Sequence, residues 1–209
     1  MKNAFTLVLF VAISSAANAQ NLLKDSGFES PAVPAGSFSS YFVPGQKIGA
    51  WDIVSSTPTG PGVTLVNGSF QADGITFNAH TGKQYLNLNE GQYFEGSDGG
   101  GVCQCEQGVE QTVMTTTGAN YILTFWLGSV YDPTTVAGYA DMSMVDVYIN
   151  GYRAASMVES GKPHSKRQIW NQYSVTFTAS SNLTKITLLN GTQWFQNDAI
   201  DDVELLPAQ

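Results

Sequence analysis

The stretch Tyr121–Ser129 reads YILTFWLGS, and its apolar residues alternate along the chain. Successive side chains of a β-strand point to opposite faces of the sheet. Leu123, Phe125 and Leu127 therefore share one face, and Trp126 lies on the other. This period of two predicts a strand with one face buried in a core.

The same period recurs along the rest of the chain, without any sustained helical periodicity. In MVDVYI, residues 144–149, Val145 and Val147 face the core, which leaves Asp146 and Tyr148 on the opposite face. Many short strands without helices predict an all-β fold, an antiparallel two-sheet β-sandwich or jelly roll. The expected strands are 21–23 continuing into 28–29, 51–54, 63–66, 84–89, 109–115, 121–129, 144–149, 154–158, 172–178, 185–190 and 199–206.

Composition narrows the possible partners. The chain of 209 residues has 9 Lys and Arg against 17 Asp and Glu, a formal net charge of −8. Nucleic acids and anionic membrane surfaces need a basic patch, so neither is expected as a partner. Charged residues make up only 12% and aromatic residues 11% of the chain, which is typical of a secreted β-domain and not of a disordered chain.

The first 19 residues have the features of a secretory signal peptide. Lys2 precedes an apolar run that ends in the small residues of Ala17-Asn18-Ala19. This A-x-A pattern predicts cleavage after Ala19, and the apolar run is too short to cross a membrane. We expect residues 20–209 to form one β-sandwich domain without a membrane span, secreted or periplasmic, in a bacterium.

Cys103 and Cys105 lie in a Gly-rich loop, GSDGGGVCQCEQG. Export would place them in an oxidising compartment. A bridge between positions i and i+2 is possible but strained, so both a local disulfide and two unlinked thiols remain open.

A face directed away from the core carries side chains that suit a sugar. Aromatic rings stack on the apolar face of a pyranose, and carboxylates accept hydrogen bonds from its hydroxyls. The sequence predicts a ligand platform of Trp126, Tyr148 and Asp146 on one sheet, with Trp194 closing the site from a loop. The alternative is that long loops cover this face and make Trp126 a second layer of core.

The two ends of the expected mature chain read NLLKDSGFESP and AIDDVELLP, with GAWDI, GKQYLNLN, GANYILTFWLG, VDVYING and WNQYSVTFTASSNLTKITLLN between them in order. This ordered set resembles the secreted family called domain of unknown function six-four-two, known from plant cell walls and bacterial exported proteins. It also resembles galactose-binding-like jelly-roll carbohydrate-binding modules. The resemblance implies a β-sandwich that binds cell-wall polysaccharide or wall protein without catalysis, and a structural calcium ion.

In the related modules an acid of the first strand and an acid of the last strand bind calcium, which the resemblance transfers to Glu29 and Asp201. Calcium takes six to eight oxygen ligands, so two carboxylates and backbone carbonyls can suffice. Asp25 and Asp202 are the second choices. In the alternative, Asp202 caps a turn or pairs with Lys185, and Glu29 is solvated.

No motif or residue spacing in the sequence identifies a catalytic residue. No GxSxG elbow accompanies His80 and His164, the two histidines. A glycoside hydrolase would need paired carboxylates such as Glu106, Glu110 or Asp146, and their spacing does not select any of them. We therefore expect a non-catalytic carbohydrate-binding module. The alternatives are a structural or adhesive protein with an envelope protein as partner and, less favoured, a glycosidase.

Overall fold

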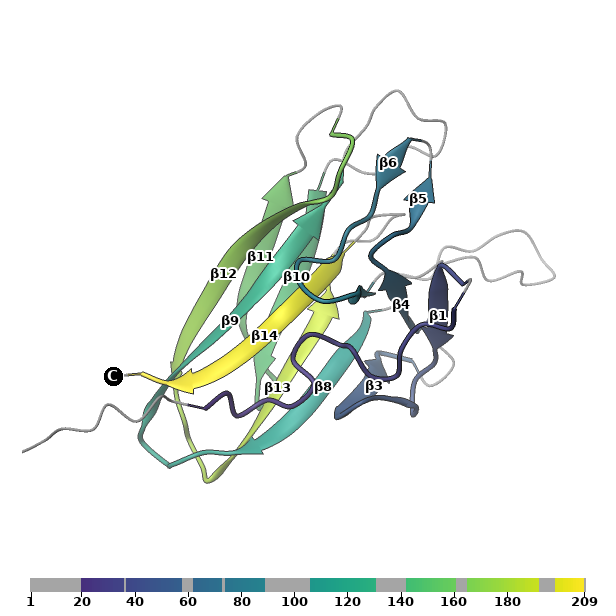
Figure 1. Ribbon diagram of the computed structural model, residues 1–209. Helices are drawn as coiled ribbons and strands as arrows, with labels where there is room; N and C mark the ends of the chain where they lie inside the picture. Colours follow the sequence, from purple (N-terminus) through teal and green to yellow (C-terminus); the bar gives the residue numbers. More distant parts are fainter. Residues whose placement is uncertain are drawn as a thin grey trace, which may run out of the picture.

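The strands of the computed structural model stack in two layers (Figure 1). The structure describes residues 20–35, 37–57, 62–72, 74–88, 106–130, 142–160, 165–191 and 198–208. Within these residues it contains strands, turns and loops and no helix, so no helix there is long and apolar enough to cross a membrane.

Two six-stranded sheets of the described residues form the layers, and every strand pair within them is antiparallel. Sheet A has the order β1 (Ser39–Phe42), β4 (Val63–Asn67), β7 (Gln84–Asn87), β14 (Ala199–Pro207), β9 (Asn120–Ser129) and β12 (Ile169–Thr178). Sheet B has the order β11 (Tyr152–Ser160), β10 (Met142–Ile149), β13 (Leu183–Asn190), β8 (Gln107–Met114), β3 (Trp51–Ser55) and β2 (Lys47–Ile48). A two-stranded sheet joins β5 (Gln71–Ala72) to β6 (Ile75–Thr76). The predicted antiparallel β-sandwich is confirmed.

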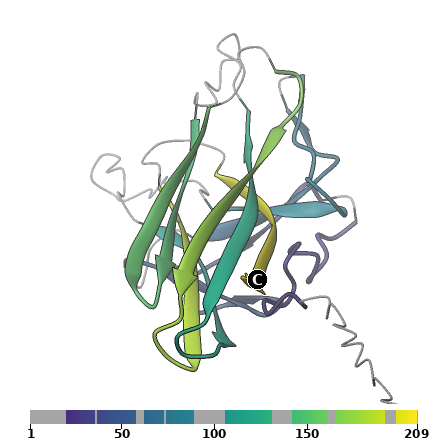
Figure 2. The same ribbon diagram turned by 90° about the vertical axis from the view of Figure 1, so that its left-hand side faces the viewer.

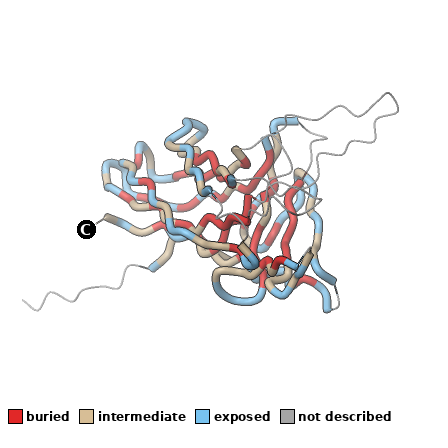
Figure 3. Tube along the Cα trace, turned by 90° about the horizontal axis from the view of Figure 1, so that it is seen from above, coloured by how far each residue is buried: buried red, intermediate tan, exposed pale blue. Residues whose placement is uncertain are grey.

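The core lies between the two sheets, whose strands Figure 2 shows from a second side. Figure 3 marks the buried stretches of the chain that form it. Leu123, Phe125 and Leu127 of β9 are fully buried and belong to the same apolar cluster as Val145 and Val147 of β10. Each such side chain contributes roughly 1.5–3 kcal/mol by leaving water. The inward faces predicted from alternation are confirmed for both strands.

The N-terminal segment 21–29, predicted as a strand, is irregular. Asp25 and Phe28 have φ angles of 51° and 54°, a left-handed conformation that interrupts an extended chain. The segment still lies along β14, where Val203 N–H donates to the Ser26 carbonyl at 2.9 Å. The ring of Phe28 anchors it by packing on Trp51, with ring centroids 5.5 Å apart.

Candidate functional site

The adjacent acids Asp201 and Asp202 sit at a β-bulge of β14. Asp201 pairs with Trp126 of β9 and Glu204 pairs with Thr124, so β14 has one residue more than β9 over this interval. Asp202 takes the extra position, with a φ of 47°. As a result, both acids, which follow the buried Ile200 and precede the buried Val203, contact the same loop. Strict alternation would instead direct them to opposite faces.

Backbone N–H groups of the loop before β7 donate hydrogen bonds to Asp201 and to Glu29 of the N-terminal segment. Asp201 Oδ2 accepts hydrogen bonds from the N–H groups of His80 at 3.0 Å and Thr81 at 3.2 Å. Two residues further along the loop, the N–H groups of Lys83 and Gln84 donate hydrogen bonds to Glu29 Oε1 at 2.8 Å and 3.3 Å. The loop thus ties the N-terminal segment to the last strand, and we call this arrangement the acid junction (Glu29, Asp201, Asp202 and residues 80–84).

Gly82 permits this arrangement of the loop. Its φ is 64°, and a Cβ atom at Gly82 would lie 2.0 Å from Glu29 Oε1. Only glycine tolerates both the left-handed backbone and the close approach of the carboxylate.

His80 covers Trp126. The two rings stack with centroids 3.8 Å apart, and His80 Nδ1 lies 2.6 Å from Asp202 Oδ2. Thr81 Oγ1 donates to Asp202 Oδ1 at 2.8 Å, so Asp202 binds this loop and not Lys185. The structure therefore favours the alternative in which Trp126 is a second layer of core beneath a loop.

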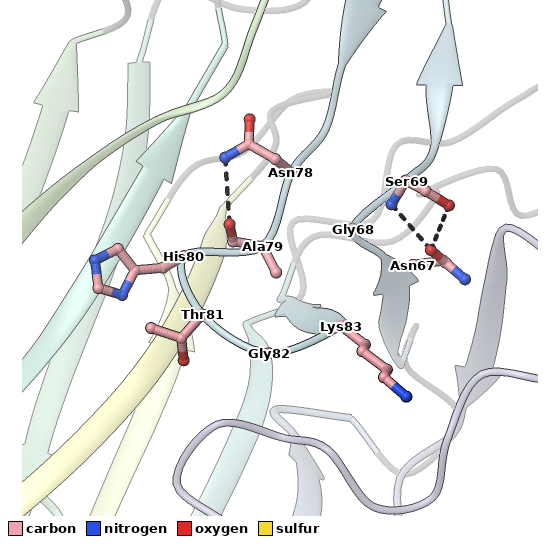
Figure 4. A pocket seen from close by; sticks show the side chains of 9 residues that line it. All are labelled: Asn67, Gly68, Ser69, Asn78, Ala79, His80, Thr81, Gly82 and Lys83. Atoms are coloured by element: carbon pink, nitrogen blue, oxygen red, sulfur yellow. Dashed lines mark hydrogen bonds between the residues drawn. The ribbon is translucent and has the colours of Figure 1, made fainter.

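A polar pocket of about 550 Å³ lies beside this loop, between the turn Asn67–Ser69 and residues 78–83. Figure 4 shows that the His80 side chain points away from the turn and Lys83 points to the opposite side of the loop. Asn67 is itself engaged, because its Oδ1 accepts hydrogen bonds from the N–H group and hydroxyl of Ser69. Among the described residues of its lining, His80 is the one with an aromatic ring, and that ring is stacked on Trp126.

Burial dominates the electrostatics of the acid junction. Asp201 is fully buried, and this burial, with the neighbouring charge of Asp202, raises the pKa of its carboxyl to about 8. Burial also raises the pKa of Asp25, whose Oδ2 is buried without a hydrogen-bond partner. Both carboxyls would be stabilised in their charged form by a cation.

The fit of calcium to these residues is partial. A Cβ atom at Gly27 would lie 3.3 Å from Asp202 Oδ1, 3.7 Å from Asp201 Oδ1 and 3.9 Å from Glu29 Cγ, so three acids approach one point. However, backbone N–H groups face Glu29 Oε1 and both oxygens of Asp201. The described residues contain no group of three or more His, Cys, Asp or Glu side chains that could hold a metal. Calcium bound by Glu29 and Asp201 therefore stays a prediction that would depend on backbone carbonyls.

The predicted ligand platform on one sheet is wrong in its geometry. Trp126 belongs to β9 of sheet A, whereas Asp146 and Tyr148 belong to β10 of sheet B. The inward residues of both strands share the core, so their outward residues lie on opposite outer faces. Alternation assigns a face to each strand but not a sheet. Trp194, Cys103 and Cys105 lie outside the described residues.

Asp146 is also less available than expected. It is only 6% exposed, and its Oδ1 accepts a hydrogen bond from Arg153 at 2.8 Å and another from Ser156. Because Asp146 pairs with Ser156 across β10 and β11, these contacts stay on the outer face of sheet B.

The outer face of sheet B carries an open groove of about 240 Å³, which we call the sheet B groove. Its volume is just below the range of roughly 300–1,000 Å³ of drug-sized ligand sites, which suits a small ligand or a short segment of a polymer. It includes the predicted residue Tyr148. Its lining residues are Val54, Ser55, Ser56, Glu106, Glu110, Tyr148, Gly151, Lys185, Thr187 and Leu189.

Strand register brings these residues together. Across the sheet, Tyr148 lies opposite Thr187, and Thr187 lies opposite Glu110. Glu110 Oε2 lies 3.0 Å from Lys185 Nζ and accepts a hydrogen bond from Thr187 at 3.4 Å. The groove therefore combines one aromatic ring with hydroxyl, carboxylate and ammonium groups on rigid strands.

Glu106 and Tyr148 both line the groove. Partial burial raises the pKa of the Tyr148 hydroxyl, and the negative charges of Glu106 and Asp146 raise it further, so the residue stays a neutral phenol. The sequence contained Glu106 and Glu110 as carboxylates that no spacing selected. Only the order β10-β13-β8 shows that they share one surface with Tyr148.

No family model and no curated protein matches this chain. Among solved structures, the chain is similar to a Stig cyclase, Fisc, from Fischerella sp. TAU in complex with an indole compound. The TM-score is 0.58 at 17% identity, covering 90% of this chain and 98% of that chain. A cyclase from Fischerella sp. TAU in complex with 4-(1H-indol-3-yl)butan-2-one gives a TM-score of 0.54 at 18% identity, covering 90% and 97%.

A third solved structure, TmCBM61 in complex with β-1,4-galactotriose, gives a TM-score of 0.47 at 18% identity, covering 91% of this chain and 100% of that chain. At these identities, the two cyclase structures show the fold alone. The chain is a two-sheet antiparallel β-sandwich, and its function must be argued from its own surface.

Proposed function

We propose that this chain is an exported, non-catalytic carbohydrate-binding β-sandwich whose ligand site is the sheet B groove. One observation carries the proposal: Tyr148 shares an open groove with Glu110, Lys185 and Thr187. The ring offers a stacking surface for the C–H face of a sugar, and the polar groups can bind its hydroxyls.

The floor of the groove supports this function. Leu189 and Val54 are half-buried apolar residues of β13 and β3 that line the same surface as Tyr148. Between their strands lies Gly108, which pairs with both residues and has no side chain to fill the floor. Such a shallow surface fits a segment of polysaccharide better than a small molecule that must be enclosed.

The absence of catalysis is part of the proposal. Glycoside hydrolysis needs two carboxyl groups that act on one bond from opposite sides. Of the two glutamates at the groove, Glu110 is held by Lys185 at 3.0 Å and by Thr187. Incubation with labelled oligosaccharides should release no shorter product, and a product lost on Glu106→Gln would make the protein a glycosidase instead.

The same proposal has three further parts. They are membership of the domain of unknown function six-four-two family, export through the signal peptide, and a structural calcium ion at the acid junction. Asp25 Oδ2, buried without a partner, and the raised pKa of Asp201 support a bound cation. Glu29 and Asp201 would hold it, and it would strengthen the link between the two ends of the domain without entering the sugar site.

A glycan array with residues 20–209 tests the function. Binding to at least one glycan class, lost on Tyr148→Ala and kept in Tyr152→Ala, supports it. Tyr152 is the matched control because it lies in the neighbouring strand, is 81% exposed and does not line the groove. Silence of the whole array, with capture of an envelope protein through another surface, would favour the adhesive alternative.

A further inference from the structure

Charged residues on the outer face of sheet B form ion pairs with one another. Arg153 is 2.8 Å from Asp146, Lys185 is 3.0 Å from Glu110, and Lys47 is 2.5 Å from Asp52. The sheet register places Glu110 opposite Asp52, so these pairs lie across neighbouring strands of one surface. Each lysine or arginine of this set is thus already matched by a carboxylate.

Glu106 stands apart from this set. It is exposed directly before β8 and lines the groove, and the described residues offer its carboxylate neither an ion pair nor a hydrogen bond. It lines the same groove as Tyr148, and its negative charge contributes to the raised pKa of that phenol. Among its described residues, the groove therefore carries one unmatched negative charge on the same surface as Tyr148.

We infer that the sheet B groove selects neutral or amino-bearing sugars and rejects uronic acids, with Glu106 as the residue that sets this preference. The inference rests on the proposed function and names its ligand class. A uronate in the groove would place a carboxylate beside that of Glu106, where Lys185, the one basic residue among the described lining, is already paired with Glu110. An amino sugar would instead place an ammonium there and could form a charge-assisted hydrogen bond.

The size of the effect follows from the separation of the charges. Repulsion between two unit charges a few ångströms apart at a protein surface corresponds to roughly a five-fold or greater loss of affinity. Because salt screens exposed charges, the discrimination should shrink between about 0.01 M and 0.3 M salt. The net charge of −8 on the whole chain acts in the same direction.

The experiment measures binding of residues 20–209 to fragments of galactan, cellulose, chitin, chitosan and polygalacturonate at low and high salt. The expected result is binding to at least one neutral or amino-bearing fragment and at least five-fold weaker binding to polygalacturonate at low salt. Glu106→Gln should narrow that difference, while Glu204→Gln, which removes an exposed carboxylate of sheet A, should leave it unchanged.

Three results would count against the inference. Equal or tighter binding of polygalacturonate overturns the charge selection and leaves sugar binding intact. An unchanged difference in Glu106→Gln, with a wild-type melting temperature, shows that Glu106 does not set the preference. Silence of every fragment removes the proposed function itself, and the inference with it.

Discussion

Trp126 and Tyr148 lie on opposite outer faces of the sandwich, Trp126 beneath the ring of His80 on sheet A and Tyr148 in the open groove of sheet B. Both occupy outward positions of half-buried strands, yet only Tyr148 lines a groove with polar groups around it. Trp126 is therefore a structural aromatic residue, whereas Tyr148 is the candidate ligand-binding residue.

Trp126→Ala should lower stability and leave sugar binding unchanged. The substitution removes the ring on which His80 stacks, beside the acid junction. Truncation of a fully buried Trp costs about 3–5 kcal/mol, and for half-buried Trp126 we expect about 2 kcal/mol. Urea unfolding measures the loss. Unchanged stability with lost binding would return Trp126 to the ligand site.

The stability of the metal-free protein should fall as pH rises from about 4 to 8. The pKa of Asp201 rises from its ordinary value of 3.8 to about 8 in the folded chain. Between these values the unfolded chain has lost the proton that the folded chain keeps, so the free energy of unfolding decreases as pH rises. Asp201→Asn should flatten the profile of melting temperature against pH over this range. A profile identical to wild type would show that Asp201 does not titrate as its burial indicates.

Calcium bound as proposed should oppose the fall in stability as pH rises. A cation beside Asp201 favours its charged form, so added calcium should raise the melting temperature most near pH 7. Saturation at 100 times the dissociation constant corresponds to about 2.7 kcal/mol. The increase should be lost in Glu29→Gln and kept in Glu159→Gln, which lies on β11. An unchanged melting temperature after EDTA treatment would contradict a calcium ion bound by Glu29 and Asp201.

Export should remove the first 19 residues. This prediction rests on the apolar run followed by Ala17-Asn18-Ala19. Mass spectrometry of protein recovered from a secreting bacterial host should find Gln20 as the first residue. Recovery of an intact N-terminus would contradict the predicted signal peptide.

The sandwich could be predicted from the sequence because its main strands obey strict alternation. Leu123, Phe125 and Leu127 are buried as the pattern requires, and Trp51 is fully buried. The pattern predicts a strand at 199–206, which β14 confirms, but not the bulge at Asp202 that brings both Asp201 and Asp202 into contact with the loop before β7. The left-handed conformation of Asp202 does not change the period of the apolar residues, so the sequence pattern does not reveal the bulge.

The candidate site could be predicted only in part, because it depends on which strands are neighbours. Alternation correctly predicts that the aromatic residue Tyr148 points outward. Its partners Glu110 and Thr187 come from strands far away in the chain, and hydrogen-bonding order alone brings them to it. Periodicity wrongly places Trp126 on the same surface, because it does not distinguish the two sheets of a sandwich.

The most direct test of the sugar site is calorimetric titration of wild type, Tyr148→Ala and Tyr152→Ala with whichever glycan the array identifies. A stacked ring that buries about 100 Å² contributes roughly 2.5 kcal/mol at 25 cal/mol per Å², which corresponds to about a fifty-fold loss of affinity. The account predicts that loss in Tyr148→Ala alone, with an unchanged melting temperature. Equal affinity of all three proteins for the glycan would contradict it and place the ligand on another surface.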